Sequence, residues 1–393
     1  MKCNIWKDCP KVPITELLSF VVDNRGKTVP TAPYGHKLVA TNCVTNNTLF
    51  PVYEKVRYLS DETYNTWFRA HPIPGDILFV NKGTPGRVCM VPDPVDFCIA
   101  QDMIALRADD TKIYNKYLFS VLRSREIQQQ IYNTSVGDVI PHFKKQFLDQ
   151  LLIPVPDRSI QKDIGDSYYL FSYKIELNNK INENLERQAQ MLYKQCFPYS
   201  VDDELPEGWR IGTVGEIIEI HDSKRIPLSG AKRSKMQKRI YPYYGAASLM
   251  DFVDDYIFDG KYLLLGEDGT VVDDAGYPIL QYVWGQFWVN NHAHILTGKL
   301  GFNVESLYML FKQTPVKSIV TGAVQPKISQ ANLRSIQVVI PPEKLLIEYN
   351  YRIEPLFALI RANKEENKSL AALRDILLPK LMSGKMDVPD IHL

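Results

Sequence analysis

The chain repeats part of its own sequence at an offset of 185 residues. A segment that begins at Gly137 and reads Gly-Asp-Val-Ile-Pro realigns with one that begins at Gly322 and reads Gly-Ala-Val-Gln-Pro. The register then continues without a gap as far as Leu192 and Leu377. This period is much longer than the roughly 20–50 residues of solenoid repeats. We therefore expect a duplicated half-protein, which presents two related sites at a fixed separation.

The totals set outer limits on what such a chain is. Its 393 residues are too many for one ordinary core and predict two or three domains. A net charge of +1 argues against an indiscriminate polyanion binder. The six cysteines form no C-x-x-C pair, which is typical of reduced thiols in a cytosolic protein. Since neither a signal region nor a run of about 18 apolar residues is present, we expect a cytoplasmic protein without a membrane partner.

A heptad pattern follows the repeated segment in both copies. Its positions recur at alternating steps of four and three, over residues 164–196 and again over 349–381. A seam of this length predicts a long helix in each copy, and two such helices pair as a coiled coil. The central seam positions are Ile175, Asn178, Asn182 and Leu185 in the first copy, and Ile360, Asn363, Asn367 and Leu370 in the second.

Two asparagines interrupt each seam at matched places. A polar residue on an apolar seam costs stability unless its partner is also polar, so it fixes the register of the pair. Antiparallel pairing would bring Asn178 close to Asn367, and Asn182 close to Asn363. The alternative is a polar gap in which the seam is solvated. We favour antiparallel pairing.

The segments around the two helices show mixed α/β patterns. Residues 114–132 carry apolar side chains at helical spacing, and residues 151–156 resemble a strand that two prolines end. We therefore predict two globular domains joined by two long antiparallel helices, with an internal pseudo-two-fold repeat. The predicted limits are 1–158 for the first domain, 159–199 for the central helix, 200–342 for the second domain and 343–393 for the C-terminal helix.

Positive charge gathers in one loop of the second domain. Residues 224–239 hold seven basic residues and no acidic one, with Tyr243 and Tyr244 close behind. A basic loop beside aromatic rings is typical of phosphate contact combined with base contact. The alternative is a solvated surface loop. Residues 251–274 then hold eight acidic residues and one lysine. We favour a solvated acidic edge; the alternatives are that this segment positions the basic loop or faces a basic partner.

Smaller groups of cations occur in both halves, near turns and after the repeated segment. They raise the expectation that each half contacts nucleic acid. The complete set of predicted DNA-contacting residues is Arg25, Lys27, Lys82, Arg87, Lys144, Lys145, Lys224, Arg225, Lys232, Arg233, Lys235, Lys238, Arg239, Tyr243, Tyr244 and Lys327.

Motifs for catalysis are weak or missing. The sequence has no Asn/Asp-Pro-Pro-aromatic loop of an adenine methyltransferase and no glycine-rich nucleotide loop. Residues 222–224 (Asp-Ser-Lys) resemble part of a nuclease motif, but nothing upstream supports it. His292 and His294 share one face of a strand, yet no third metal ligand is suggested. Residues 266–269 are expected to form an acidic turn, with base contact as the alternative. We therefore expect neither a catalytic residue nor a metal.

The order of these motifs resembles that of the specificity subunit of type I restriction-modification systems. The turn at residues 23–28 is similar to the opening of such subunits, and residues 153–161 to their central region. Residues 221–228, 241–246 and 264–269 are similar to one recurrent type of target-recognition domain. The match covers residues 12–388. One departure is Leu346, which stands in the second copy where the first has Gln161.

The resemblance implies two target-recognition domains, each of which reads one half of a split site on double-stranded DNA. It also implies that the two helices act as a spacer and bind two modification (methyltransferase) subunits, which carry S-adenosylmethionine and methylate adenine. A restriction (translocase/nuclease) subunit can join the complex for cleavage. This chain would then bind no cofactor and hold no active site. The competing interpretations are a stand-alone sequence-specific DNA-binding protein and a nuclease with its own active site.

Overall fold

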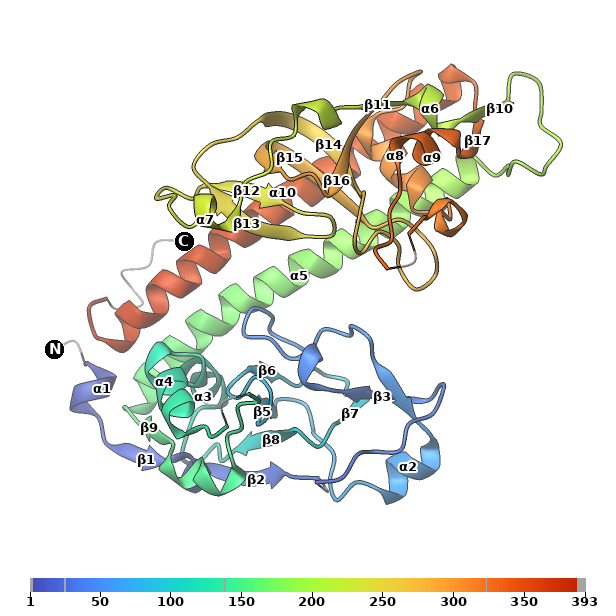
Figure 1. The fold of residues 1–393 in the computed structure, drawn as a ribbon. Helices are drawn as coiled ribbons and strands as arrows, with labels where there is room; N and C mark the ends of the chain where they lie inside the picture. Colours follow the sequence, from blue (N-terminus) through green and yellow to red (C-terminus); the bar gives the residue numbers. More distant parts are fainter. Residues whose placement is uncertain (1–2, 25, 138, 323, 387–393) are drawn as a thin grey trace. The chain divides into compact units, whose positions relative to one another are not determined.

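The computed structural model describes residues 3–24, 26–137, 139–322 and 324–386. The chain divides into two compact units (Figure 1). Unit 1 comprises residues 1–180 and 363–393, and unit 2 comprises residues 181–362. Each unit therefore contains one globular region together with a part of each long helix. Because this division groups residues by contact, the predicted limits of the four sequential segments stay a prediction.

Unit 1 is built on a four-stranded sheet in the order β2-β8-β5-β6 and a three-stranded sheet in the order β4-β3-β7. A small antiparallel pair, β1 with β9, closes the region where the chain approaches the long helix. The strands are β1 (Lys11–Pro13), β2 (Leu18–Val22), β3 (His36–Val39), β4 (Arg57–Leu59), β5 (Ile77–Val80), β6 (Val88–Met90), β7 (Phe97–Ile99), β8 (Met103–Ala108) and β9 (Leu152–Pro154), and the short helices are α1 (Ile5–Asp8) and α2 (Asp61–Thr66).

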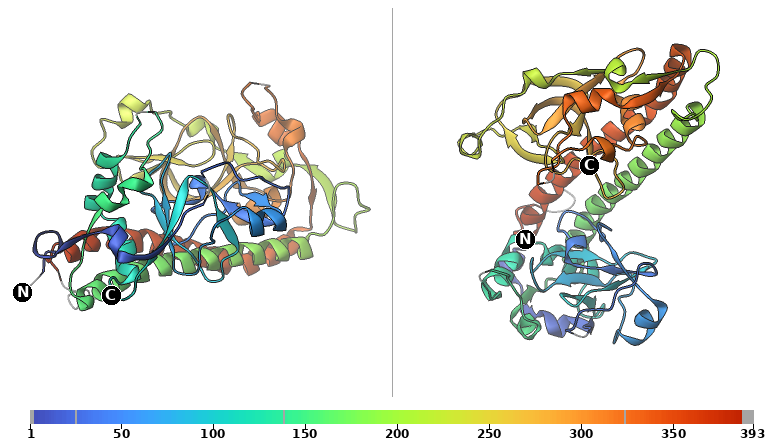
Figure 2. Two further views of the ribbon diagram at one scale, coloured as in Figure 1. Left: turned by 90° about the horizontal axis from the view of Figure 1, so that it is seen from below. Right: turned by 45° about the vertical axis from the view of Figure 1, so that its right-hand side comes forward.

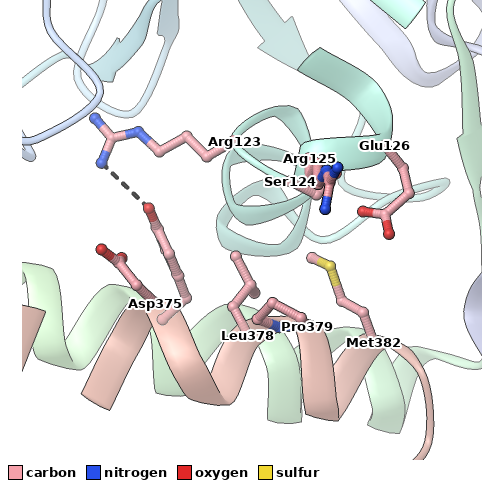
Figure 3. Close-up of a pocket in the computed structure, with 9 residues that line it drawn as sticks. Arg123, Ser124, Arg125, Glu126, Asp375, Leu378, Pro379 and Met382 are labelled. Atoms are coloured by element: carbon pink, nitrogen blue, oxygen red, sulfur yellow. Dashed lines mark hydrogen bonds between the residues drawn. The ribbon is translucent and has the colours of Figure 1, made fainter. Parts of the chain in front are cut away.

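The single helix predicted over residues 114–132 is two helices, α3 (Asn115–Leu122) and α4 (Arg125–Thr134). The break occurs because Ser124 caps α4: its hydroxyl oxygen accepts a hydrogen bond from the Ile127 N–H. Figure 3 shows how this corner lies over the last part of α10, with Leu378 and Met382 beneath it. Arg123 at the corner donates to the Tyr168 hydroxyl of α5 at 3.4 Å. The corner thus joins the globular region of unit 1 to both of its helix segments.

Unit 2 repeats the strand order of unit 1. Its six-stranded sheet has the order β11-β16-β14-β15-β12-β13, and β10 pairs with β17 as β1 pairs with β9. The elements are β10 (Arg210–Thr213), α6 (Val214–Ile217), β11 (Ile218–Ile220), α7 (Gly230–Arg233), β12 (Tyr241–Tyr244), β13 (Leu249–Val253), β14 (Phe258–Gly266), β15 (Leu280–Val289), β16 (Ala293–Gly298), α8 (Val304–Phe311), α9 (Gln330–Ser335) and β17 (Gln337–Ile340).

The two units differ in one strand. In unit 2 the single strand β15 pairs with β14 along one stretch and with β12 along another. In unit 1 its place is taken by two strands, β6 and β7, so the sheet divides in two. Pro92 and Pro94 lie between β6 and β7. Because proline has no N–H to donate to a neighbouring strand, these residues account for the interruption.

Both long helices are unbroken (Figure 2). They are α5 (Arg158–Cys196) and α10 (Glu343–Met382). Within unit 1, Asn178 Nδ2 donates to Asn367 Oδ1 at 2.9 Å, which is the contact that antiparallel pairing predicts. Asn178 is fully buried. Asn182 and Asn363 belong to different units, and their predicted pairing stays a prediction.

Within unit 2 the remaining parts of the two helices also pack together. The Tyr349 hydroxyl of α10 donates to the backbone oxygen of Ala189 in α5 at 3.1 Å. Of the other predicted seam positions, Ile360 is buried, whereas Ile175, Leu185 and Leu370 are half-buried. In the part of the chain that the structure describes, no helix is long and apolar enough to cross a membrane.

Candidate nucleic-acid interface

The segments that open the 185-residue repeat form closed loops in both units. In unit 1, Val136 and His142 exchange two backbone hydrogen bonds of 2.9 and 2.8 Å, and in unit 2 Thr321 and Lys327 do the same. Gly137 has a φ of +97°, and a Cβ there would lie 2.8 Å from the Ile140 backbone oxygen. Glycine is therefore required at this turn. We call the described residues of these segments, 137 and 139–141 in unit 1 and 322 and 324–326 in unit 2, the repeat loops.

A second loop is bonded to each repeat loop. In unit 1, Phe143 N donates to Asn81 O at 2.8 Å, and Gly83 N donates to Pro141 O at 2.9 Å. In unit 2, Ile328 N donates to Glu267 O at 2.8 Å, and Gly269 N donates to Pro326 O at 3.0 Å. We call residues 81–83 and 267–269 the glycine loops. The two units thus present the same loop pair, built by the same backbone bonds.

The surface of the loop pairs combines apolar and cationic side chains. Val139 is 93% exposed and Val324 is 100% exposed. Lys82 and Lys144 are exposed beside the pair in unit 1, as is Lys327 in unit 2. Exposed apolar side chains near cations suit a partner with phosphates outside and flat bases inside.

The other cations predicted for unit 1 lie in different settings. Lys27 and Arg87 are exposed. Lys145 is half-buried and forms an ion pair with Asp23. Arg25 lies outside the described residues. Of the described cations predicted for unit 1, four are therefore exposed to solvent. Lys82 and Lys144 lie near the loop pair, and Lys27 and Arg87 lie in two turns.

The basic loop, residues 224–239, divides by residue type. Its four lysines, at positions 224, 232, 235 and 238, are exposed, and none forms an ion pair within the described residues. Its arginines are held by acids: Arg233 lies 3.1 Å from Asp251, and Arg239 also pairs with Asp251. The loop contains one short helix, α7, which the sequence did not predict. The lysines therefore remain available for phosphates, while the arginines shape the loop.

The acidic segment that follows supports the basic loop. Asp251 accepts hydrogen bonds from the Phe252 N–H and from Arg239, and these hold the pKa of its carboxyl below the usual range. Asp254 accepts from the backbone N–H groups of Arg239 and Gln237, which lowers its pKa in the same way. Of the interpretations that the sequence left open for this segment, the positioning of the basic loop is thus visible for Asp251 and Asp254.

The two tyrosines behind the basic loop are packing residues in this structure. Tyr243 is only 2% exposed, and its hydroxyl oxygen accepts a hydrogen bond from Leu228 N at 3.1 Å. Tyr244 is half-buried, with its ring edge-on to Phe287. The ring of Tyr243 is covered by protein in this structure, and the DNA contact predicted for it stays a prediction.

Arg225 also points inward rather than to solvent. Its guanidinium lies 2.5 Å from Glu267 and 3.4 Å from Asp222, and it donates to the Ala293 backbone oxygen at 2.8 Å. Lys327 lies 3.3 Å from the other oxygen of Glu267. The Glu267 carboxylate is thus neutralised by two cations. This argues against the base contact that the sequence offered as an alternative for the acidic turn.

The two predicted strand histidines have separate partners. His292 Nδ1 lies 2.5 Å from Asp268, at the surface. His294 is fully buried; Nδ1 donates to Asp222 Oδ2 at 2.6 Å and Nε2 donates to Ile328 O at 2.8 Å. Both acceptors are unprotonated oxygens, so we assign a proton to each ring nitrogen. Burial raises the pKa of Asp222, but the hydrogen bond and charge of His294 outweigh burial and leave that pKa below its usual value.

Asp222, Glu267 and His294 are also the three side chains that could together hold a cation, since their ligand atoms lie within 4.8 Å of one another. The sequence did not suggest this combination, because the three residues are far apart along the chain. A metal needs unprotonated imidazole nitrogens and free carboxylate oxygens. Here both ring nitrogens and both carboxylates already have protein partners. The donor set therefore fits an internal hydrogen-bond network.

Comparison with known proteins places these features in a family. Residues 27–187 and 206–368 match the family described as "Type I restriction modification DNA specificity domain". The MjaIX specificity subunit of Methanocaldococcus jannaschii is 24% identical over 355 residues, covering 81% of this chain and 79% of that protein. The putative specificity subunit S.HindORF215P of Haemophilus influenzae is 31% identical over 144 residues, covering 37% of this chain and 36% of that protein.

One solved structure shares the fold. The type I restriction-modification S subunit of M. genitalium superimposes with a TM-score of 0.58 at 19% identity, over 94% of this chain and 95% of that one. The two matched segments together cover most of the chain, one in each half. The class that the fold and the matches define is the DNA-specificity subunit. This chain belongs to the type I restriction-modification DNA specificity family.

Proposed function

We propose that this chain reads a two-part DNA site for a type I restriction-modification complex, with one half-site read by each unit. The observation that carries the proposal is the duplicated loop pair, which is closed by the same backbone hydrogen bonds in both units. Loops held in the same way twice, each beside exposed lysines, suit two similar readings of one duplex. The lysines contact phosphates and fix the position of each unit, and neighbouring side chains read the bases.

The proposal extends to the partners. The outer faces of α5 and α10 carry exposed apolar residues that the seam does not use, and these are suited to binding other subunits. Two methyltransferase subunits would bind there and supply S-adenosylmethionine, and restriction subunits would join for cleavage. On this proposal the chain itself has no catalytic residue, binds no cofactor and works in the cytoplasm. The exposed residues are Leu170, Tyr173, Leu177, Met191, Leu345, Ile347, Tyr351, Leu359, Leu373 and Ile376.

The test is methylome sequencing of a host that expresses this chain beside its neighbouring methyltransferase, compared with the same host lacking this chain. We expect adenine methylation at a two-part motif, which disappears without the chain. An unchanged methylome in the presence of an active methyltransferase would contradict the proposal. In that case the purified chain would be assayed for metal-dependent cleavage and for DNA binding alone, the two competing functions.

A further inference from the structure

An aspartate follows the first strand of the main sheet in each unit. Asp222 comes after β11 and Asp23 comes directly after β2. Each binds the residue that stands at the same place in the 185-residue repeat. Gln330 Nε2 donates to Asp222 Oδ2 at 2.6 Å, and Lys145 forms an ion pair with Asp23. Both units therefore contain the same contact between an aspartate and a matched residue of the repeat, Asp23 with Lys145 and Asp222 with Gln330. We call this contact the tie.

In unit 2 this tie extends into the sheet. Asp222 Oδ1 accepts a hydrogen bond from Ile295 N at 3.0 Å, and Asp222 Oδ2 accepts from His294. The other nitrogen of His294 holds the backbone oxygen of Ile328, which directly follows the repeat loop and its closing bond. A single buried carboxylate thus joins the start of the basic loop, strand β16 and the end of the repeat loop.

The glycine loop of unit 2 is bound to the same centre. Arg225 stands three residues after Asp222, and its guanidinium lies 2.5 Å from the Glu267 carboxylate. Lys327, which directly follows the repeat loop, lies 3.3 Å from the same carboxylate. Buried charges persist only when they are paired and hydrogen-bonded, so these groups hold one arrangement. The basic loop, the glycine loop and the end of the repeat loop of unit 2 are therefore fixed by one set of internal contacts.

We propose that Asp222 is a positioning residue for DNA reading by unit 2, and that Asp23 has the corresponding role in unit 1. The inference rests on the proposed function, in which these loops contact DNA. Neither carboxylate touches the duplex, since each acts through the side chains and backbone that it holds. Base reading needs donors held within about 0.5 Å, whereas lysine–phosphate contact tolerates movement. Loss of the tie should therefore relax base discrimination more than it weakens DNA binding.

The test compares Asp222→Asn, Asp23→Asn and the control Asp202→Asn in the complete complex. Each is expressed with the methyltransferase, and methylated adenine is mapped in host genomic DNA. Asparagine places an amide donor where Asp222 meets the donors of His294 and Gln330. We expect D222N to raise methylation at sites with one mismatch about tenfold, only in the half-site of unit 2. D23N should do so about threefold in the other half, because its ion pair is more exposed.

Asp202 is exposed in the linker before β10, so D202N should leave both halves of the motif unchanged. Equal relaxation of both halves by D222N, or no relaxation of either, would overturn the proposal. If D222N abolishes all methylation, Gln330→Ala decides, because it removes one exposed side of the tie and must relax the same half-site. Failure of the proposed function looks different, because the wild-type chain would then direct no two-part motif.

Discussion

In unit 1 an amide closes the loop pair, whereas in unit 2 an imidazole holds the same backbone position. Asn81 Nδ2 donates to Phe143 O at 3.1 Å, and His294 Nε2 donates to Ile328 O at 2.8 Å. Phe143 and Ile328 are copies of each other in the repeat. Asn81 stands where unit 2 has Glu267, because the backbone oxygens of Asn81 and Glu267 accept from the N–H groups of these two copies. One backbone geometry is thus kept by two different sets of side chains.

The difference follows from one position of the sheet. Asn81 N donates to Asp102 O in the same way that Glu267 N donates to His292 O, so Asp102 and His292 occupy matching places. Two residues further along, Ile104 in unit 1 therefore occupies the place that His294 has in unit 2. The isoleucine side chain has no hydrogen-bond donor, so in unit 1 the donor to the Phe143 oxygen is Asn81, which belongs to the glycine loop itself. Unit 1 also leaves Asn81 Oδ1 buried without a hydrogen-bond partner among the described residues. A duplicated recognition fold can therefore vary its internal polar contacts and still present the same loops.

The largest expected effect is the loss of the imidazole from unit 2. His294→Ala leaves the Ile328 carbonyl without its side-chain donor and removes one of the donors to the buried Asp222 carboxylate, and should lower the local free energy of unfolding by about 3 kcal/mol. Asn81→Ala in unit 1 should cost about 1–2 kcal/mol, because it removes one neutral bond. Hydrogen exchange of the complete chain would show the protection lost in β16 and residues 321–330 for the first variant.

His292→Ala provides the matched control, because its imidazole is two residues from His294 in the sequence but is 44% exposed. It should leave the protection of residues 321–330 close to that of the wild type. Equal losses of protection in His294→Ala and His292→Ala, or a loss that spreads equally through unit 1, would contradict the contrast between the Asn81 and His294 contacts.

A smaller effect concerns pH. The pKa of Asp222 in the folded protein lies below its usual value of 3.8, because the opposing effect of burial is outweighed by His294 and the Ile295 N–H. The stability from the ionised carboxylate is therefore complete above that usual value and is lost as the pH falls through the lower folded pKa. The stability gap between the wild type and D222N should shrink when urea unfolding is repeated at about pH 3 instead of pH 7. A gap that is constant with pH would show that charge is not what Asp222 contributes.

Much of this architecture could be read from the sequence, because it depends on periodicity and on the repeat offset. The heptad seam placed both long helices, and the matched asparagines predicted the Asn178–Asn367 contact. The break between α3 and α4 was missed because Ser124 lies within a pattern whose helical spacing continues on both sides. A cap depends on the local backbone, which a count of apolar positions does not detect.

The loop pair and the buried tie were also missed, because their residues are far apart in the sequence. Composition shows that Arg225 is a cation in a basic loop, but not that Glu267 lies beside it. The signal that was available is the repeat itself: Lys145 and Gln330 occupy matched places, and both bind an aspartate. Comparing the polar residues at the 185-residue offset would have pointed to them.

The smallest effect separates the lysines of the basic loop from its arginines. Lys235→Gln should lower the slope of log affinity against log salt by about 0.9 for a random-sequence duplex, because it removes one phosphate contact. Arg233→Gln should leave the slope nearly unchanged, since Arg233 is already paired with Asp251. The measurement is a salt titration of DNA binding by the complete complex, with Lys82→Gln as the counterpart in unit 1. An equal change of slope for Lys235 and Arg233 would mean that the acidic segment releases its arginines to DNA, and that unit 2 reads with its whole basic loop.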